Sequence, residues 1–461
     1  MLPDDVLLTI FDFCVDESEP TTMLPMLSME RFQAWRTLVH VCRQWRSLVF
    51  VSPRRLNLQL VYSTKTPVRA LDVWPALPLV IRCDNGFPIE SVDNIVAVLE
   101  RSKRVCQIDL IGVSISDLEK VSMAMQVPFP ELRRLQLSSD EKTAAVIPGS
   151  FFGGSAPHLQ YFAFHGIPLT GLPKLLLSAT HLDYLYLFDI PPSGYFSPET
   201  MVSALSTLTS LRSLRLGFQS PLCRPDEANR RPPPLTRLVL PALKSFKFKG
   251  VGEYLEDLVA HIDAPQLLIF HITFFNQIVF DTPQFIQFIS RTPMLIPLEK
   301  AHIIFDAGAA RVKLSSRTSG YGELKVKIPC IELDWQVSSL EQVCTLCLPP
   351  LSTLEDLYIY ENFLSMGKPK WQDNIENTLW LELLQPFTTV KDLYLSEEFA
   401  PRIVPALQEL VGGRTTEVLP TLQNIFSEGL HEGIQQFVAT RQASLPITVV
   451  PWDGHGKSLY F

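Results

Sequence analysis

The chain has 461 residues, of which 46% are hydrophobic and only 19% are charged, and its formal net charge is -8. A charged fraction below the roughly 25% of an average soluble protein, with so many apolar residues, excludes a largely disordered chain. The acidic balance and the absence of a long Lys/Arg run argue against nucleic acid as a partner.

The amino terminus, Met1–Asp5, has neither a basic stretch nor the apolar core of a signal peptide. No window of the sequence approaches the ~18 uninterrupted apolar residues of a membrane span. The 8 cysteines are scattered rather than spaced as a disulfide framework, which is typical of free thiols in a reducing compartment. We therefore expect a cytoplasmic or nuclear protein with no membrane partner.

A short helix is predicted directly after the first residue. Pro3 suits a first helical turn because its missing N–H costs nothing there, and Asp4 and Asp5 lie near the positive end of the helix dipole. The apolar residues that follow at helical spacing are Leu2, Val6, Leu7, Ile10 and Phe11. They predict one apolar face.

A second helical segment is predicted from Arg31 to Phe50. It combines an apolar stripe with an arginine-rich polar face. The stripe consists of Leu38, Val41, Cys42, Trp45 and Leu48/Val49. Ser52-Pro53 ends the segment.

Together the two segments resemble an F-box. The resemblance rests on the pattern Leu-Pro-x-x-x-Leu-x-x-Ile-Phe from Leu2 to Phe11, on Val-Cys-Arg-Gln-Trp-Arg from Val41 to Arg46, and on the closing Ser-Pro. The layout looks most like the F-box-like proteins of mushroom-forming fungi, whose box often carries an insert between its first and second helices. That insert would lie at about residues 16–31 here. An F-box typically begins a few residues before its Leu-Pro, so the resemblance implies a box shortened at its start.

The resemblance implies a partner, because F-box proteins bind a Skp-type adaptor of a cullin–RING ubiquitin ligase. The matching residues expected to contact that adaptor are Leu2, Pro3, Val6, Leu7, Ile10, Leu38, Val41, Cys42 and Trp45. A short helical hairpin has too little interior to bury all these groups, so the surplus is expected to cover a partner helix or the adjoining repeats. Trp45 is the expected anchor, since Trp is enriched among binding hot spots; alternatively, it packs the box against the rest of the chain.

Beyond residue 60 a short phrase recurs, in which Leu, two mostly polar positions, Leu, any residue and Leu follow one another. The clearest copies start at Leu132, Leu159, Leu182, Leu211, Leu235, Leu354 and Val390, and weaker copies start near Val105, Leu243, Leu267, Leu298 and Leu422. The first five starts are 27, 23, 29 and 24 residues apart, within the ~20–29 residues of leucine-rich repeats. The Leu-x-Leu part alternates as a strand does, and stretches such as Met201–Leu208 and Phe285–Ile289 between phrases look helical.

The predicted fold class is α/β. A short N-terminal helical F-box, residues 1–60, precedes an irregular leucine-rich repeat solenoid, residues 61–461, with a curved parallel sheet and outer helices. The Asn that usually follows the strand in such repeats is mostly missing. Leu222–Pro234 and Ala307–Tyr321 are rich in turn-forming residues and are expected to be inserted loops.

Two local patterns allow both a structural and a functional interpretation. Lys244, Lys247 and Lys249 alternate with phenylalanines, which favours a strand with a solvated face over a nucleic-acid patch. Cys344-Thr-Leu-Cys347 has no second cysteine pair or histidine pair at zinc-finger spacing, which favours a buried strand over a metal or redox site.

No catalytic spacing is present, since the sequence lacks G-x-S-x-G, G-x-x-x-x-G-K-[ST] and H-E-x-x-H. No catalytic, cofactor-binding or metal-binding residue and no cofactor is therefore predicted.

In the repeat phase, alternate strand positions point away from the core, where Tyr and Arg are good contact residues. The outward positions predicted to contact a substrate are Tyr184, Tyr186, Arg215, Tyr358 and Tyr394. Alternatively, loops partly cover them.

The function predicted from the sequence is that of a substrate-recruiting adaptor of a cullin–RING (SCF-type) ubiquitin ligase. The box would bind a Skp-type adaptor, and the repeats would bind an unknown protein substrate. The alternative is a repeat-protein scaffold or ligand-binding module with a vestigial box and no ligase role. An enzyme is not expected.

Overall fold

Each strand of the repeats begins about two residues after the recurring phrase starts. The phrases at Leu132 and Leu159 give β4 (Arg134–Ser138) and β5 (Tyr161–His165), and the first leucine of each phrase is buried. The alternating apolar residues of the strands, leucines in β4 and phenylalanines in β5, are buried as well, because every second side chain of a strand points to the same face. The phrase is therefore the core-facing part of one repeat.

The computed structural model describes residues 2–15, 34–52, 59–62, 77–83, 92–139, 147–168, 172–225, 236–275, 280–296, 298–317, 322–348, 351–362, 371, 375–410, 417–429, 432–441 and 446–454. These residues belong to two compact units, Met1–Tyr195 and Phe196–Phe461. The insert expected at about residues 16–31 lies outside the described residues. The boundary between the units falls inside the stretch 61–461 that the sequence suggested as one solenoid.

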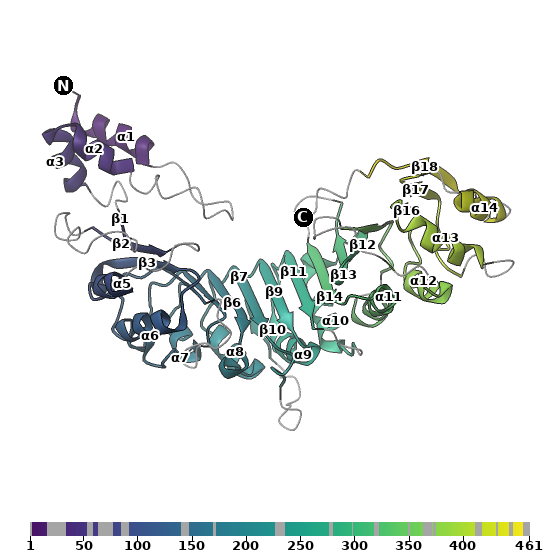
Figure 1. The fold of residues 1–461 in the computed structure, drawn as a ribbon, viewed down its shortest axis with the longest axis horizontal. Coiled ribbons are helices and arrows are strands. Elements are labelled where there is room, and N and C mark those ends of the chain that lie inside the picture. The colour runs from purple at the N-terminus through teal and green to yellow at the C-terminus, as the bar shows by residue number, and fades with distance from the viewer. Residues whose placement is uncertain are drawn as a thin grey trace. The chain divides into compact units, whose positions relative to one another are not determined.

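The first unit contains a parallel sheet in which the strands follow one another in chain order (Figure 1). Its described strands are β1 (Leu60–Tyr62), β2 (Leu79–Cys83), β3 (Val105–Leu110), β4, β5 and β6 (Tyr184–Ile190). Its described helices are α1 (Asp4–Val15), α2 (Ala34–Val41), α3 (Arg43–Val51), α5 (Val92–Leu99), α6 (Ile115–Ala124) and α7 (Leu172–Leu176). The helices from α5 onward alternate with the strands, as a strand-and-helix repeat requires.

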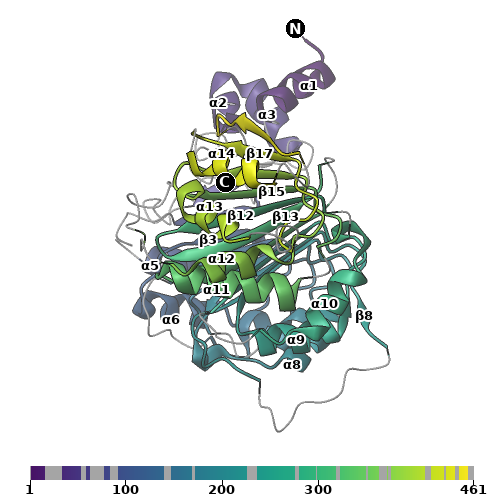
Figure 2. The same cartoon turned by 90° about the vertical axis from the view of Figure 1, so that its right-hand side faces the viewer.

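The second unit continues the same strand-and-helix alternation. Its main strands are β7 (Ser213–Phe218), β9 (Ser245–Gly250), β11 (Ile269–Phe274), β12 (Lys300–Asp306), β13 (Ala309–Ser315), β14 (Glu323–Pro329), β15 (Asp356–Glu361), β16 (Asp392–Leu395), β17 (Asn424–Ser427) and β18 (Thr448–Pro451). Its helices are α8 (Pro198–Leu205), α9 (Gly252–Ala260), α10 (Pro283–Ser290), α11 (Leu333–Gln342), α12 (Asn377–Leu384), α13 (Ala400–Gln408) and α14 (Glu432–Arg441). Figures 1 and 2 show α9 to α13 on one side of the strands.

The leucine-rich-repeat-like architecture predicted for this region is therefore confirmed in its main features. The helices expected at Met201–Leu208 and Phe285–Ile289 correspond to α8 and α10. Among the described helices, none combines the length and the apolar character that a membrane crossing requires.

The expectation that Ala307–Tyr321 is a loop was wrong. It contains β13, which runs antiparallel to both of its neighbours, β12 and β14. The strand order β11-β14-β13-β12-β15 follows, so the sheet is parallel except at this inserted strand. The turn residues Ala307 and Gly308 join β12 to β13 as a tight hairpin, which is why the segment looked turn-rich.

The phrase at Leu235 also departs from the prediction. Leu235 itself lies outside the described residues, and the strand that follows is the short β8 (Leu238–Val239). Among the described strands, β8 pairs with β10 (Ile262–Asp263) alone, in a separate two-stranded parallel sheet. β9 then takes the next place in the main sheet, beside β7. The phrase therefore predicts a strand but not which sheet that strand joins.

Backbone hydrogen bonds link each repeat to the previous one just before the strand begins. The amide of Gln160 donates to the carbonyl of Arg133 at 2.8 Å, and the amide of Gln423 donates to the carbonyl of Lys391 at 2.8 Å. These bonds satisfy peptide groups that would otherwise be buried without partners. They also fix the register of neighbouring strands.

Backbone hydrogen bonds also link the repeats at the C-terminal ends of the strands. Leucine-rich repeats usually have a ladder of Asn side chains at this place. The amide of Gly166 donates to the carbonyl of Phe188 at 2.9 Å, and the amide of Ser396 donates to the carbonyl of Ile359 at 3.1 Å. The buried Ser396 hydroxyl donates to the Glu361 carboxylate of the neighbouring repeat. A serine–glutamate pair thus links these two repeats without Asn.

Helices of adjacent repeats are joined by a buried carboxylate. Glu256 lies on α9 with only 5% of its surface exposed. Its two oxygens accept hydrogen bonds from the amides of Gln284 at 2.9 Å and Phe285 at 2.7 Å, in the first turn of α10. These amides have no partner within their own helix, and the carboxylate also meets the positive end of the helix dipole.

We predict that Glu256→Ala destabilises the second unit by about 1–3 kcal/mol, because the buried Phe285 amide and the part-buried Gln284 amide would lose their acceptor. The matched control is Glu253→Ala on the same helix, whose side chain is 40% exposed and whose loss should cost little. Thermal unfolding followed by circular dichroism would compare them. Equal shifts in the two midpoints would contradict the capping role.

Candidate interaction surfaces

The N-terminal helices α1, α2 and α3 form the first candidate surface. The segment Arg31–Phe50 was predicted as one helix, but it breaks at Cys42 into α2 and α3. Cys42 has extended backbone and caps α3, since its Sγ accepts a hydrogen bond from the Trp45 amide at 3.4 Å. The break turns the predicted stripe into two short faces.

The three helices have a small core of their own. Leu7, Leu8 and Phe11 of α1 are buried, as are Leu38 and Val39 of α2 and Val49 of α3. A polar contact adds to this packing, because the Gln44 amide group on α3 donates to the Asp4 carboxylate on α1 at 3.3 Å.

Trp45 takes part in this packing. Its ring meets Phe11 edge to face with 4.8 Å between the ring centroids, and the residue is half-buried. Such a pair adds about 0.5–1.5 kcal/mol beyond the buried area. The sequence predicted that Trp45 contacts the adaptor or packs the box against the rest of the chain, and not that it packs on α1. This packing arises because the break at Cys42 brings the Trp45 ring onto α1.

A second face of α1 is apolar and exposed. It carries Val6, Ile10 and Phe13, and Leu2 lies just before the helix. These four residues are between 39% and 78% exposed. Val6, Ile10 and Phe13 lie within one narrow sector of the helix, because positions three and four apart share a face. Val41 at the end of α2 is 56% exposed and Cys42 is exposed too. We call Leu2, Val6, Ile10 and Phe13 the exposed helical face.

The nine residues predicted to contact the adaptor therefore separate into two groups. Leu2, Pro3, Val6, Ile10, Val41 and Cys42 are exposed, whereas Leu7 and Leu38 are buried and Trp45 is half-buried. The sequence analysis missed Phe13, because it falls outside the F-box pattern. Its helical spacing from Ile10 was the available signal.

Each of the two units has a further candidate surface, the face of its strands that the helices leave uncovered. In β9 the phenylalanines Phe246 and Phe248 are buried, while Lys247 and Lys249 between them are half-exposed. The same alternation places the predicted contact residues Tyr184, Tyr186, Arg215, Tyr358 and Tyr394 on this helix-free face. Tyr184 is exposed and the others are half-buried.

In the first unit this face holds a tyrosine cluster. The rings of Tyr161, Tyr184 and Tyr186 lie 5.4–6.1 Å apart. The Arg134 guanidinium lies 3.7 Å from the centre of the Tyr161 ring and is also paired with the buried Asp109 carboxylate at 3.0 Å. The arginine is thereby held in a fixed position over the ring.

In the second unit the same face carries an aromatic ladder. His302 of β12, Tyr358 of β15, Tyr394 of β16 and Phe426 of β17 occupy the same register. Their rings stack in sequence, with centroids 4.5, 4.1 and 4.4 Å apart. Trp452 lies against Tyr358 and Tyr394 at 6.1 and 5.6 Å. Sequence analysis identified only the two tyrosines, since His302, Phe426 and Trp452 belong to weak or absent copies of the phrase.

His302 is the most deeply buried member of this ladder, with 1% of its surface exposed. The Tyr360 hydroxyl lies 3.4 Å from its Nδ1. Burial, together with the nearby Lys313 and Lys300 ammonium groups, lowers the pKa of His302 to about 3. His302 is therefore neutral at physiological pH.

Among the described residues, no group of three or more His, Cys, Asp or Glu side chains could hold a metal ion. Cys344 and Cys347 lie in a π-helical turn, Val343–Cys347, and not in the strand that was expected. Both thiols are buried, and burial raises the pKa of Cys347 to about 12.

Comparisons with known proteins add little to this description. No protein-family model matches the chain, and no curated protein matches it. Among solved structures, the chain is similar to the leucine-rich repeat-containing protein LegL7 from Legionella pneumophila. That likeness covers 84% of this chain and 98% of the other, with 11% identity and a TM-score of 0.26. The repeat architecture assigned here rests on the strands and their register.

We predict that His302 makes stability depend on pH between pH 7.5 and pH 5. The unfolded side chain has a pKa of ~6.5, so the unfolded chain takes up the proton first. The contribution of His302 is fully present above pH 6.5 and is lost as the pH falls towards 3. Between pH 7.5 and pH 5 it amounts to about 2 kcal/mol.

Denaturant unfolding at the two pH values would measure this loss. His302→Phe, which retains a stackable ring, should lose less stability than the wild type between them. His158→Gln, at an exposed position, serves as control and should behave like the wild type. An unchanged pH dependence in His302→Phe would refute the assignment.

Proposed function

We propose that this protein is a substrate-recruiting adaptor of a cullin–RING ubiquitin ligase. In this proposal helices α1 to α3 bind a Skp-type adaptor protein, and the helix-free face of the repeats binds a protein substrate. The protein would act in the cytoplasm or nucleus by binding alone, without catalysis of its own.

The observation that carries the proposal is the exposed helical face. Its apolar side chains remain exposed although α1 to α3 have a buried core of their own. Contiguous exposed apolar groups are typical of protein–protein contacts. Positions three and four apart on one helix are suited to packing against another helix.

The resemblance to the F-box agrees with this placement in part. Leu2, Val6, Ile10 and Val41 match the F-box pattern and are exposed. The two buried matches, Leu7 and Leu38, would act indirectly by holding α1 and α2 in position. Trp45 would do the same through Phe11.

The helix-free face supports a role for the repeats in substrate binding. Its exposed and half-buried Tyr and Arg side chains come from several successive strands. Tyr and Arg are enriched in the centres of protein interfaces. Many have their rings or guanidinium groups fixed by neighbours, so little side-chain entropy would be lost on binding.

We predict that Val6→Asp combined with Ile10→Asp weakens binding to a purified Skp-type adaptor by at least about tenfold, because two carboxylates would be buried in an apolar contact. Size-exclusion chromatography and calorimetry with the full chain would measure this. The matched control is Val127→Asp, since Val127 is 46% exposed and Val6 is 43% exposed, but Val127 lies outside α1 to α3.

Circular dichroism must show that each variant is folded. Leu7→Ala provides a comparison for a damaged core, because Leu7 is buried and its truncation should cost about 2–5 kcal/mol. If the folded wild-type chain does not bind the Skp-type adaptor, the ligase proposal fails and a repeat scaffold without a ligase role remains.

A further inference from the structure

The helix-free face of the second unit carries Lys or Arg side chains on four of five neighbouring strands. One row across these strands consists of Arg215 of β7, Lys247 of β9, His271 of β11, Lys325 of β14 and Lys313 of β13. Because these residues share one register, their side chains project from the same face. The row continues directly into the aromatic ladder, since Lys313 is in register with His302.

A second row lies two residues further along the same strands. It contains Lys249 of β9, Thr273 of β11, Lys327 of β14 and Arg311 of β13. We call the seven cations of both rows, Arg215, Lys247, Lys249, Arg311, Lys313, Lys325 and Lys327, the basic patch. The sequence suggested only that Lys247 and Lys249 have a solvated face, because the other strands bring in the remaining cations.

Carboxylates neutralise part of this patch. Glu323 accepts hydrogen bonds from Lys313 at 2.8 Å and from His271 at 2.6 Å, and Asp306 pairs with Arg311. Within the described residues, no ion pair reaches Lys247, Lys325 or Lys327. The patch therefore remains positive, although the chain as a whole carries a net charge of -8.

The lysines of the patch also repel one another. Burial lowers the pKa of Lys325, and the adjacent Arg311 and Lys313 lower it further. Burial and Arg311 act in the same way on the pKa of Lys327. Both lysines are half-exposed, so an anion can reach them. Bound carboxylates would relieve this repulsion.

The spacing of the cations indicates what kind of anion fits. Neighbouring strands are ~4.8 Å apart, and alternate residues of a strand are ~6.6 Å apart. A single small anion would contact only two or three of these side chains, whereas the patch spans β7 to β13. An extended chain with several negative groups matches this spread, since its alternate side chains repeat at a similar distance.

We propose that the basic patch binds an extended, aspartate- and glutamate-rich segment of a partner protein. The proposal deepens the proposed function, since it names the class of substrate segment that the repeats would recognise. The carboxylates would lie over the patch. Apolar or aromatic residues of the same segment would pack against the edges of the aromatic ladder, which begins in the same row.

A protein segment fits this surface better than single-stranded nucleic acid does. Nucleic acid gains much of its affinity from bases stacked on open aromatic faces. Here the faces of Tyr358 and Tyr394 are already stacked on their neighbours at 4.1–4.5 Å.

Fluorescence polarisation with the full chain and a fluorescein-labelled poly-Glu peptide tests the proposal. We expect saturable binding that weakens with added salt, because the contact is electrostatic. Lys325→Glu combined with Lys327→Glu should weaken binding by about tenfold or more. The milder Lys325→Gln combined with Lys327→Gln should give a smaller loss, and circular dichroism would establish that both variants are folded.

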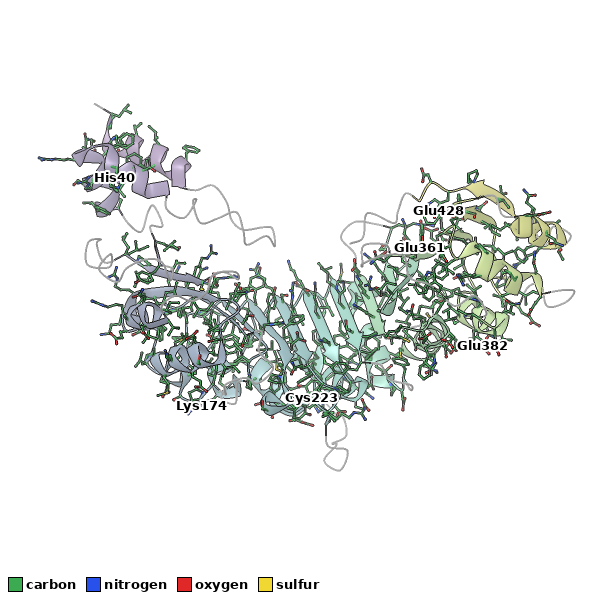
Figure 3. The ribbon with its side chains drawn as sticks, in the orientation of Figure 1. His40, Lys174, Cys223, Glu361, Glu382 and Glu428 are labelled. Atoms are coloured by element: carbon green, nitrogen blue, oxygen red, sulfur yellow. The ribbon has the colours of Figure 1, made fainter. Side chains whose placement is uncertain are left out.

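The matched control is Lys103→Glu combined with Lys174→Glu, which changes the net charge equally. Both lysines are exposed and lie in the first unit; Figure 3 shows Lys174 on the helix side of the strands. This control should bind poly-Glu like the wild type. An equal loss in the control, no binding by the wild type, or tighter binding of oligo-dT than of poly-Glu would each overturn the proposal.

The two proposals can fail separately in these experiments. Val6→Asp combined with Ile10→Asp should leave poly-Glu binding unchanged, because these residues lie on α1. Lys325→Glu combined with Lys327→Glu should leave binding to the Skp-type adaptor unchanged. A wild-type chain that binds poly-Glu but not the Skp-type adaptor would therefore count against the ligase role and leave the basic patch in place.

Discussion

The alternation of side chains along each strand, repeated in register from strand to strand, is the constraint on which the structure depends. Backbone hydrogen bonds between successive repeats hold that register. Large apolar groups therefore collect on one face, where Phe246 stacks on Phe270 with ring centroids 5.1 Å apart. The opposite face needs no apolar residues for stability, so its side chains are available for binding.

Pairing in register also explains why the helix-free face is divided into chemically uniform stretches. A residue type that recurs at one phase of the repeat meets its own kind on the next strand. Aromatic rings gain from this arrangement, as the stacked Tyr358 and Tyr394 show. Lysines do not, since like charges ~5 Å apart repel. The basic patch therefore costs stability, which makes a binding role a physically sensible reason for its presence.

The N-terminal helices also bury one face and leave another exposed. Helix α1 is apolar on two faces, and only the face with Leu7 and Phe11 has a partner within α1 to α3. The cap at Cys42 determines this division, because ending α2 there redirects α3 and its Trp45 towards α1. The exposed helical face is what remains after this packing.

The sequence alone determined the position of most strands, because the recurring leucines report directly which side chains must be buried. It also predicted the phase that places Tyr184 and Tyr358 outside the core. Such local patterns do not predict which strands pair with one another. β8 and β9 carry similar phrases but join different sheets, and β13 enters an antiparallel pairing that its turn-rich sequence did not indicate. Only the tertiary structure decided which cations became neighbours and which apolar residues of α1 stayed exposed, since both depend on contacts between segments distant in the chain.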